Sequence, residues 1–385
     1  MLNLTGFQSF LIAGFECASH RPRHRRRLDL TAATHHDRYA LNDYRRALSD
    51  GFGTVRDGIR WHLIEKTAYH YDFKSVLPMI RAARIAGVQV LWDICHFGWP
   101  DGLDIFSPAF VDRFGSLAHA FAQVLVDETD DIIFITPINE PSYLAWAAGQ
   151  AGYIYPYATG RGAELKQQLL RAYIAGIEAI RSVQPAARIV VTDPLIHVLP
   201  HPESPERSVA ARALQEAQYE FRDQLLEAGE DRRYLDIVGA CYYDYNQWYD
   251  RGHVLSNVPL APHDPNRRPL SELLERLYTR YDRPLFLAET STELGERVAL
   301  ARMVCREVAC AQAAGVPVGG ICWYPAIDHL GWDDDRPCYH GLWGKSDVSG
   351  NREIFRPLLD VLQEEAVANN WMREEFISSA GYEAA

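Results

Sequence analysis

Eight short apolar runs, each followed by a longer segment with helical periodicity, constrain the fold of this chain most strongly. The runs have the length and the near-continuous hydrophobicity of strands in a parallel sheet that is covered on both faces. They lie at residues 9–17, 54–61, 88–95, 131–140, 188–195, 236–243, 284–292 and 319–328. Helices are predicted at residues 37–50, 73–86, 108–128, 162–183, 206–228, 270–281, 296–314 and 352–368. A strand–helix unit repeated eight times predicts an α/β fold, a single (β/α)8 TIM barrel.

A doubly wound open sheet is the alternative arrangement for alternating strands and helices. That fold usually carries a glycine-rich phosphate loop directly after its first strand. Here the first run continues as "GFECASH", residues 14–20, which is not such a loop. We therefore expect one barrel domain over residues 1–372 and a C-terminal tail over residues 373–385.

Charge and cysteine usage limit the possible partners and the compartment. The formal net charge of −12 argues against a general nucleic-acid-binding surface. No apolar run reaches the roughly 18 residues that a membrane-spanning helix needs. The seven cysteines form no C-x-x-C pair, which favours free thiols in a reducing compartment. The apolar N-terminus has no basic residue before its apolar part, so it reads as a first strand rather than a signal peptide. We expect a cytoplasmic protein.

Polar side chains gather where the predicted strands end. In barrels of this kind the reactive groups lie at the C-terminal ends of the strands. The fourth run ends in Asn139 and Glu140, and the seventh contains Glu289. The other strand-end candidates are Glu16, His20, Arg56, His96, Tyr243 and Trp323.

Glu140 and Glu289 are the most informative of these residues. The fourth and seventh strands face each other across a barrel mouth, so the two carboxyl groups can flank one bond. Burying a carboxylate there does not help folding, because an unpaired buried charge is costly. Two facing carboxyl groups are what glycoside hydrolysis requires, one as an acid and one as a nucleophile or base. The pair predicts a glycoside hydrolase.

Several segments resemble glycoside hydrolase family 1, the β-glucosidase family of the larger clan A of barrel hydrolases. "FITPINEPSYLAW" resembles its T-x-N-E-P motif, and "PLFLAETS" is similar to its "PIYITENG". Further similar segments follow in the same order from about residue 9 to 365: "TVRDGIRW", "HFGWPDGL", "DIVGACYYDY", "CWYPAIDHLGW" and "YHGLWGKSD". The chain looks like a divergent, shortened member.

The resemblance implies a role for each matching residue. Glu140 would be the general acid/base and Glu289 the nucleophile of a retaining mechanism. Arg56 and Tyr243 would orient Glu289, with Tyr242 as the alternative to Tyr243. Asn139 would bind the sugar 2-hydroxyl, His96 would bind a neighbouring hydroxyl, and Trp323 would form a stacking floor.

The residues that grip the sugar in family 1 are largely replaced. His20 stands in place of a glutamine, with Glu16 nearby, and Gly331 stands in place of an acid just before Trp332. His20, Glu16 and Trp332 are therefore further substrate-binding candidates for an unusual sugar. The arginine-rich loop 21–27 could bind an anionic substrate group, be solvated, or contact another subunit. The acids of "WDDDR", residues 332–336, could instead pair with that loop.

Three functions stay open at this point. The first is a retaining β-glycosidase that releases a terminal sugar from a small glycoside. The second is another clan A retaining hydrolase that cuts an oligo- or polysaccharide internally, and the third is a catalytically silent sugar-binding barrel. We expect no cofactor and no metal, because His35/His36 and Asp333–Asp335 lack the spacing of a ligand set. A homodimer is possible.

Overall fold

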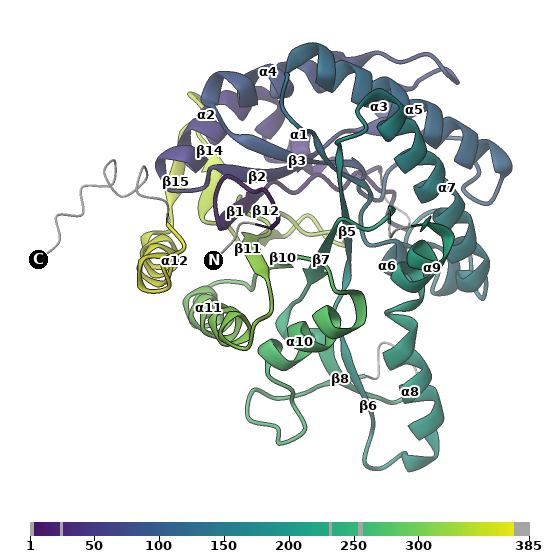
Figure 1. Ribbon diagram of the computed structural model, residues 1–385, viewed down its shortest axis with the longest axis vertical. Helices are drawn as coiled ribbons and strands as arrows, with labels where there is room; N and C mark the ends of the chain where they lie inside the picture. The colour runs from purple at the N-terminus through teal and green to yellow at the C-terminus, as the bar shows by residue number, and fades with distance from the viewer. Residues whose placement is uncertain (1–3, 24–25, 231–232, 253–256, 373–385) are drawn as a thin grey trace, which may run out of the picture.

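The computed structural model describes residues 4–23, 26–230, 233–252 and 257–372. The predicted tail, residues 373–385, lies outside them. Eight parallel strands close into a barrel in the order β1-β11-β10-β7-β5-β4-β3-β2 (Figure 1). The strands are β1 (Leu11–Gly14), β2 (Thr54–Gly58), β3 (Gln89–Cys95), β4 (Phe134–Ile138), β5 (Arg188–Pro194), β7 (Ile237–Cys241), β10 (Leu285–Thr290) and β11 (Val318–Trp323). Seven lie within a predicted run and β11 begins one residue before its run, so the TIM barrel prediction is confirmed.

The two faces of the barrel strands bury different sets of side chains. A small cluster fills the interior and includes Ile12, Leu91, Phe134 and Phe286. A much larger cluster joins the outward faces of the strands to the surrounding helices. Because both faces are buried, the strands read as continuous apolar runs rather than as alternating ones.

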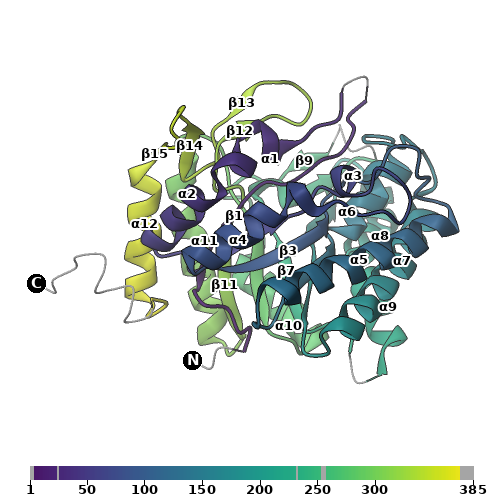
Figure 2. The ribbon, with the colours of Figure 1, turned by 90° about the horizontal axis from the view of Figure 1, so that it is seen from above.

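The helices form the outer layer. They are α1 (Leu30–Ala33), α2 (His36–Ser49), α3 (Trp61–Ile64), α4 (Leu77–Ala86), α5 (Pro108–Glu128), α6 (Pro141–Leu144), α7 (Gly162–Val183), α8 (Ser208–Ala217), α9 (Glu220–Ala228), α10 (Leu270–Tyr281), α11 (Glu296–Ala313) and α12 (Arg356–Ala368). Helix α5 buries Phe110, Phe114, Leu117, Phe121 and Leu125, the face that repeats every three to four residues. Helix α12 lies beside α11 at the outer edge of this layer (Figure 2).

Two predicted helices differ from the observed ones. The segment 206–228 is divided into α8 and α9, and Gln218 at the division exchanges hydrogen bonds with the backbone of Ile196. The segment 352–368 opens with the short strand β15 (Arg352–Ile354), and its helix begins only at Arg356. Pro357 stands in the first turn of α12, where its missing N–H costs no hydrogen bond.

Short strands outside the barrel were not predicted. Strands β6 (His197–Pro200), β8 (Gln247–Asp250) and β9 (Val258–Pro259) form a small sheet beyond β5 and β7, at the lower end of Figure 1. Strands β12 (His329–Leu330) and β13 (Pro337–Cys338) pair after β11, and β14 (Trp343–Ser346) pairs with β15. They are two to four residues long, too short for a periodicity to show in the sequence.

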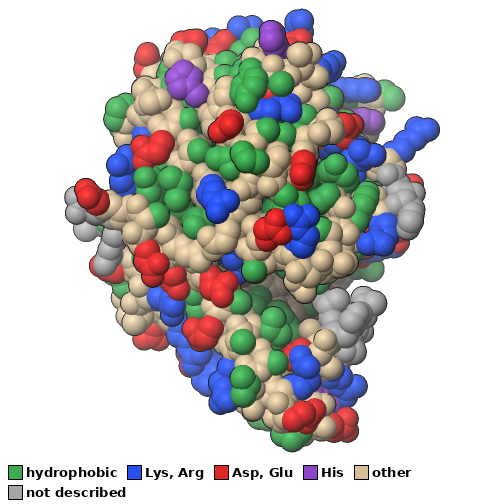
Figure 3. Space-filling view, turned by 90° about the vertical axis from the view of Figure 1, so that its right-hand side faces the viewer, with side chains coloured by type: hydrophobic (Ala, Val, Ile, Leu, Met, Phe, Trp, Pro, Cys, Tyr) green, Lys and Arg blue, Asp and Glu red, His purple; other side chains and the backbone are tan. Residues whose placement is uncertain are grey.

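Acidic and basic side chains are interspersed on the face of the molecule seen in Figure 3. Within the described residues, no helix combines the length and the apolar character needed to cross a membrane. All seven cysteines lie in described segments and are free thiols, as expected.

Candidate active site

The two predicted catalytic glutamates lie together at the C-terminal mouth of the barrel. Glu140 directly follows β4, and Glu289 is the fifth residue of β10. One carboxylate oxygen of each, together with Cys241 Sγ from the end of β7, all lie within 4.8 Å of one another. The exposed fractions of Glu140 and Glu289 are 9% and 4%. The fold thus brings two acidic groups, far apart in the sequence, into one nearly closed space.

Glu289 is held from two sides. Arg56 Nη1 on β2 lies 2.7 Å from Glu289 Oε1, and the Tyr243 hydroxyl donates to Oε2 at 2.9 Å. Tyr242, the alternative to Tyr243, instead contacts Gln247 and Arg267 through its hydroxyl. Donors on both oxygens favour a carboxylate and fix its plane.

Arg56 organises the floor of the mouth. It is fully buried, and besides Glu289 it bonds both oxygens of Asp93, with Nη2 to Oδ2 at 2.8 Å. Its Nη2 also donates to Asn139 Oδ1 at 2.5 Å. Two carboxylates and an amide oxygen surround the guanidinium, and their hydrogen bonds offset the free-energy cost of burying its charge.

Glu140 has a different environment. Burial, and after it the nearby charges of Glu289 and Asp193, hold the pKa of the Glu140 carboxyl well above its usual range. No cation bonds its carboxyl in the described structure. The pair therefore divides into a carboxyl group that favours its protonated form and a carboxylate held by an arginine, which is the arrangement of an acid next to a nucleophile.

The backbone at Glu140 is strained. Its φ of 41° and ψ of 60° lie in the left-handed region, which a residue other than glycine rarely adopts. Pro141 follows, and Asp193 anchors the turn by accepting hydrogen bonds from the backbone N–H and the hydroxyl of Ser142, at 3.0 and 2.5 Å. The strand end and its anchor aim the Glu140 side chain at Glu289.

Asn139 and His96 are oriented by a chain of hydrogen bonds. Asn139 Oδ1 accepts from Arg56 and from Thr192 Oγ1 at 2.8 Å, so its amide nitrogen faces His96 Nε2 at 3.1 Å. The other ring nitrogen of His96 lies 2.9 Å from Asp93 Oδ2. His96 therefore donates from Nδ1 and accepts at Nε2.

His20 is the least satisfied polar side chain of the mouth. It is 2% exposed, yet neither ring nitrogen has a hydrogen-bond partner in the described part of the chain. Burial lowers its pKa to about 3, so the imidazole is neutral. Buried polar groups are nearly always paired, so two unpaired nitrogens indicate a place where a ligand supplies the partner.

Aromatic rings surround His20. Trp332 lies 4.5 Å from the His20 ring, centroid to centroid, and 5.6 Å from Phe97. Tyr143 packs against Phe97 at 5.4 Å. Glu16 is buried nearby, its Oε1 3.8 Å from His96 Nε2. The predicted residues His20, Glu16, His96 and Trp332 therefore belong to one side of the mouth, which rings and imidazoles close.

Trp323 differs from its expected place. It belongs to the outer core cluster, it is fully buried, and its indole N–H donates to the carbonyl of His340 at 2.8 Å. The neighbouring Tyr324 belongs to the interior cluster, and its ring lies under the Arg56 guanidinium at 5.0 Å. Because alternate strand residues face opposite sides, the interior position belongs to Tyr324, and this burial does not support a stacking floor at Trp323.

The arginine-rich loop 21–27 packs on neighbouring loops. Arg21 and Arg27 pair with Asp101, and Arg23 donates to the carbonyl of Gly152 at 2.7 Å. His24 and Arg25 lie outside the described residues. Asp333, in the acidic run, accepts from the Tyr153 hydroxyl at 2.7 Å. Arg21, Arg23 and Arg27 thus have structural partners that account for them without an anionic ligand.

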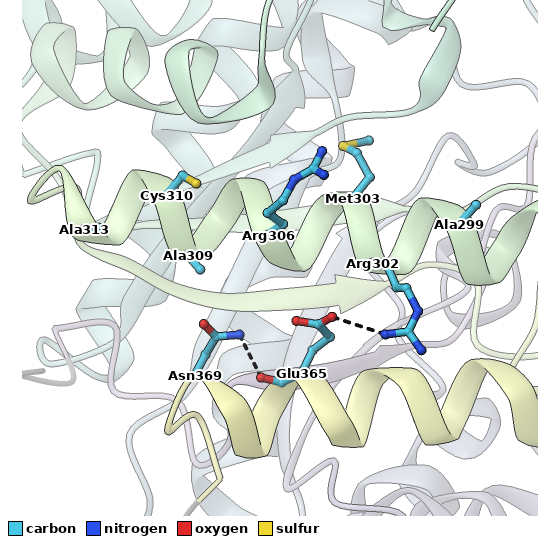
Figure 4. Close-up of a pocket in the computed structure, with 9 residues that line it drawn as sticks. All are labelled: Ala299, Arg302, Met303, Arg306, Ala309, Cys310, Ala313, Glu365 and Asn369. Carbon is cyan, nitrogen blue, oxygen red and sulfur yellow. Dashed lines mark hydrogen bonds and ion pairs between the residues drawn. The ribbon is translucent and has the colours of Figure 1, made fainter.

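An open groove of about 700 Å³ lies away from the mouth, between α11 and α12 (Figure 4). Arg302 and Glu365 pair across it, and Asn369 donates to the carbonyl of Glu365. None of the candidate site residues lines it. The groove is therefore not part of the candidate active site.

Sequence reasoning did not single out Cys241, Tyr143 or Tyr324. The Sγ of Cys241 lies within 4.8 Å of a carboxylate oxygen of each glutamate. Tyr324 directly follows the last residue of β11, so its interior position depends on where that strand ends. No pattern marks Tyr143, which reaches the mouth from the short helix α6.

A closed eight-stranded parallel barrel with a carboxyl pair at its C-terminal mouth defines this chain as a TIM barrel with the layout of an enzyme. No model of a known protein family matches the sequence, and no curated protein matches it. Solved structures do match. A family 1 β-glucosidase from Thermotoga maritima in complex with isofagomine lactam has a TM-score of 0.73 at 16% identity, covering 95% of this chain and 98% of that one.

Two further structures agree. The β-glycosidase of the hyperthermophile Thermosphaera aggregans has a TM-score of 0.73 at 15% identity, with 98% and 99% of the two chains covered. A hyperthermophilic β-glucosidase mutant that forms a dodecamer in its crystal has a TM-score of 0.73 at 16% identity, with 92% and 99% covered. The chain has the fold of family 1 β-glucosidases over nearly its whole length.

Proposed function

We propose that this protein is a retaining β-glycosidase, a divergent member of glycoside hydrolase family 1 that releases a terminal β-linked sugar from a small glycoside. One observation carries the proposal: carboxylate oxygens of Glu140 and Glu289 lie within 4.8 Å of each other. Carboxyl groups about 5–5.5 Å apart are typical of retaining enzymes, whereas inverting enzymes leave a wider gap for water. The fold of the similar structures supports the same class.

In the first step Glu289 attacks the anomeric carbon. A bond forms between a Glu289 oxygen and that carbon, and the bond from the carbon to the leaving oxygen breaks. Glu140 gives its proton to the leaving oxygen, which departs as an alcohol. The raised pKa of Glu140 keeps that proton available, and Arg56 and Tyr243 keep Glu289 aimed.

In the second step water replaces the aglycone. Glu140, now ionised, takes a proton from water, whose oxygen attacks the anomeric carbon and releases Glu289. Asn139 has one amide hydrogen beyond its bond to His96 for the sugar 2-hydroxyl. His20, Glu16 and Trp332 would hold the remaining hydroxyls and one face of the ring. His96 would bind a hydroxyl by exchanging its Nε2 contact with Asn139 for it.

The closed side of the mouth favours release of a terminal sugar over internal cleavage. The rings of Phe97, Tyr143 and Trp332 pack against one another on that side, which would limit the room for a long chain. The glutamate pair argues against a catalytically silent barrel. Two carboxyl groups this close repel each other when both are ionised, and sugar binding alone does not require such a pair. Seven free thiols favour a reducing compartment such as the cytoplasm.

A panel of aryl β-glycosides tests the proposal. It would include glucoside, galactoside, xyloside, fucoside, glucuronide and 6-phosphoglucoside, each assayed with wild type, Glu140→Gln and Glu289→Gln. Glu275→Gln, an exposed position on α10, is the matched control. We expect one glycoside to turn over, both mouth variants to lose activity by orders of magnitude, and the control to match wild type.

Two results would change the conclusion. If every aryl glycoside stays intact while a polysaccharide is cut, the internally cleaving hydrolase replaces this proposal. If sugars bind but neither substrate class turns over, the barrel is a binding protein.

A further inference from the structure

A second cluster of chemically reactive side chains lies beside the mouth, on the hairpin that follows β11. His329 on β12 and Cys338 on β13 are direct cross-strand partners, and His340 follows two residues later. One ligand atom from each of the three lies within 4.8 Å of the other two. His329 and Cys338 are buried, and His340 is half-buried. None of them contributes to the proposed hydrolysis.

The spacing suits a small metal ion. Zinc binds histidine nitrogen at about 2.0–2.1 Å and cysteine sulfur at about 2.3 Å, so its ligand atoms lie about 3.3–3.6 Å apart in a tetrahedron. The observed upper limit of 4.8 Å requires a contraction of about an ångström, which histidine side chains on a short hairpin can supply.

Neighbouring groups already fix the histidine rings. His329 Nδ1 lies 2.7 Å from the carbonyl of Leu330, so Nδ1 carries the proton and Nε2 has a free lone pair. His340 Nδ1 lies 3.2 Å from Ser291 Oγ, which leaves Nε2 for a ligand. Histidines that bind metals usually donate their other N–H to a carbonyl or a similar acceptor.

Glu293 offers a fourth ligand. Its Oε1 lies 3.3 Å from His340 Nε2, the separation of two ligand atoms on one tetrahedral ion. Arg336 holds the Glu293 carboxylate with both terminal nitrogens at 2.7 Å. The simpler reading is a hydrogen bond between His340 and Glu293, which needs no ion.

Cys338 would supply the sulfur ligand. Its Sγ has a weak contact at 3.7 Å with the carbonyl of Arg336. An incoming divalent ion would displace the thiol proton to solvent and gain a thiolate ligand.

We propose that His329, Cys338 and His340, with Glu293 as fourth ligand, form a binding site for Zn²⁺. The sulfur and imidazole ligands exclude Mg²⁺ and Ca²⁺, which prefer oxygen. The ion would join the hairpin that carries Trp332 to the segment after Glu289, which contains Ser291 and Glu293. It would therefore hold one wall of the mouth in place.

Cobalt uptake tests the site independently of glycosidase activity. Metal-free full-length protein would be titrated with Co²⁺ and then with Zn²⁺, followed by absorption spectroscopy. We expect one Co²⁺ per chain, visible bands typical of a tetrahedral site, and a sulfur-to-cobalt band in the near ultraviolet. One equivalent of Zn²⁺ should remove all of these bands.

Variants then assign the ligands. Cys338→Ser should lose the sulfur-to-cobalt band, and His329→Gln should weaken Co²⁺ binding at least tenfold. Cys310→Ser, which changes an exposed thiol, should behave as wild type. The proposal is overturned if folded wild-type protein takes up no stoichiometric Co²⁺, or if Cys338→Ser keeps the same spectrum. The first result would leave the simple His340–Glu293 hydrogen bond.

Discussion

Two buried clusters of charged side chains in this molecule differ in how their charges are paired. The first, the helix-side cluster, consists of His36, Asp43, Asp57 and Arg352, where α2 meets the barrel. The His36 nitrogens lie 2.8 Å from Asp43 Oδ2 and 2.8 Å from Asp57 Oδ2, and Arg352 bonds both oxygens of Asp43. Each charge faces an opposite charge, so this cluster reads as structural.

The mouth cluster leaves charges and donors unmatched. Glu140 faces Glu289, a like charge, and both nitrogens of His20 lack partners among the described residues. Burial lowers the pKa of His36, but Asp57 and Asp43 outweigh it and raise that pKa to about 9. At His20 burial is unopposed and lowers the pKa to about 3. Two histidines of equal burial thus differ by what surrounds them. A cluster of buried groups that does not stabilise the fold indicates a functional site.

The largest expected effect is the loss of activity in Glu289→Gln. Removing the nucleophile should lower kcat on the best aryl glycoside by at least about 10⁴-fold. The melting temperature should fall, because the single amide oxygen can accept from only one of Arg56 and Tyr243. The protein should still fold, because Arg56 keeps its two bonds to Asp93. Steady-state kinetics and thermal unfolding of the same sample check this. A small kinetic effect with a large loss of stability would place Glu289 in a structural cluster.

The helix-side cluster should show the reverse. Asp43→Ala leaves His36 and Arg352 without a shared partner, and breaking a buried pair costs about 3–5 kcal/mol. We expect urea unfolding to report this loss, while kcat/KM at a temperature where the variant is folded stays within a few-fold of wild type. If Asp43→Ala lowers the activity as much as Glu289→Gln does, the helix-side cluster is not purely structural.

The helix-side cluster should also depend on pH in a defined direction. Because folding raises the pKa of His36 to about 9, its contribution is complete below the unfolded pKa of about 6.5. It declines as the pH rises towards 9. His36→Gln should therefore destabilise the protein at pH 6, on the order of 3 kcal/mol, and much less at pH 10. A difference that does not change with pH would show that His36 is uncharged.

Glu140→Gln should separate stability from activity. The folded-state pKa of Glu140 is raised, so its contribution to stability is complete below about pH 4.5 and is lost as pH rises. The glutamine variant cannot ionise, so its stability relative to wild type should increase with pH, by at most about 1.4 kcal/mol per pH unit. Thermal unfolding from pH 4 to 9 measures this. A flat difference would mean that Glu140 has an ordinary carboxyl environment.

The smallest expected effect is at His20. His20→Phe removes two unpaired buried nitrogens, so stability should be unchanged or slightly higher. If a sugar hydroxyl pairs with His20, KM should rise about tenfold, since a lost hydrogen bond is worth about 1–1.5 kcal/mol. His62→Phe is the control for the same change of side chain, because the Nδ1 of His62 also lacks a partner among the described residues. Unchanged kinetics would remove His20 from the sugar site.

The barrel strands and the two glutamates could be predicted from the sequence. All eight barrel strands were predicted, because strands buried on both faces leave continuous apolar runs such as "VQVLWDIC". Glu140 and Glu289 were identified because a buried carboxyl group at a strand end does not stabilise the fold, which points to a function. Arg56 was placed beside Glu289 through the family resemblance, and the structure shows that contact at 2.7 Å.

The remaining features depend on contacts between distant segments. Whether Trp323 or Tyr324 faces the interior depends on where β11 ends, which hydrophobicity alone does not show. Among the described residues, the lack of partners for His20 depends on which side chains the neighbouring segments place beside it. The cluster of His329, Cys338 and His340 arises from the pairing of two-residue strands, which are too short to leave a pattern.

The identity of the nucleophile tests the central claim most directly. A 2-deoxy-2-fluoro-β-glycoside of the accepted sugar slows breakdown of a glycosyl-enzyme, so that mass spectrometry can locate it. We predict one sugar adduct per chain on the peptide containing Glu289, and none in Glu289→Gln. No adduct, together with a first product of inverted anomeric configuration, would contradict the account, as would an adduct on another residue.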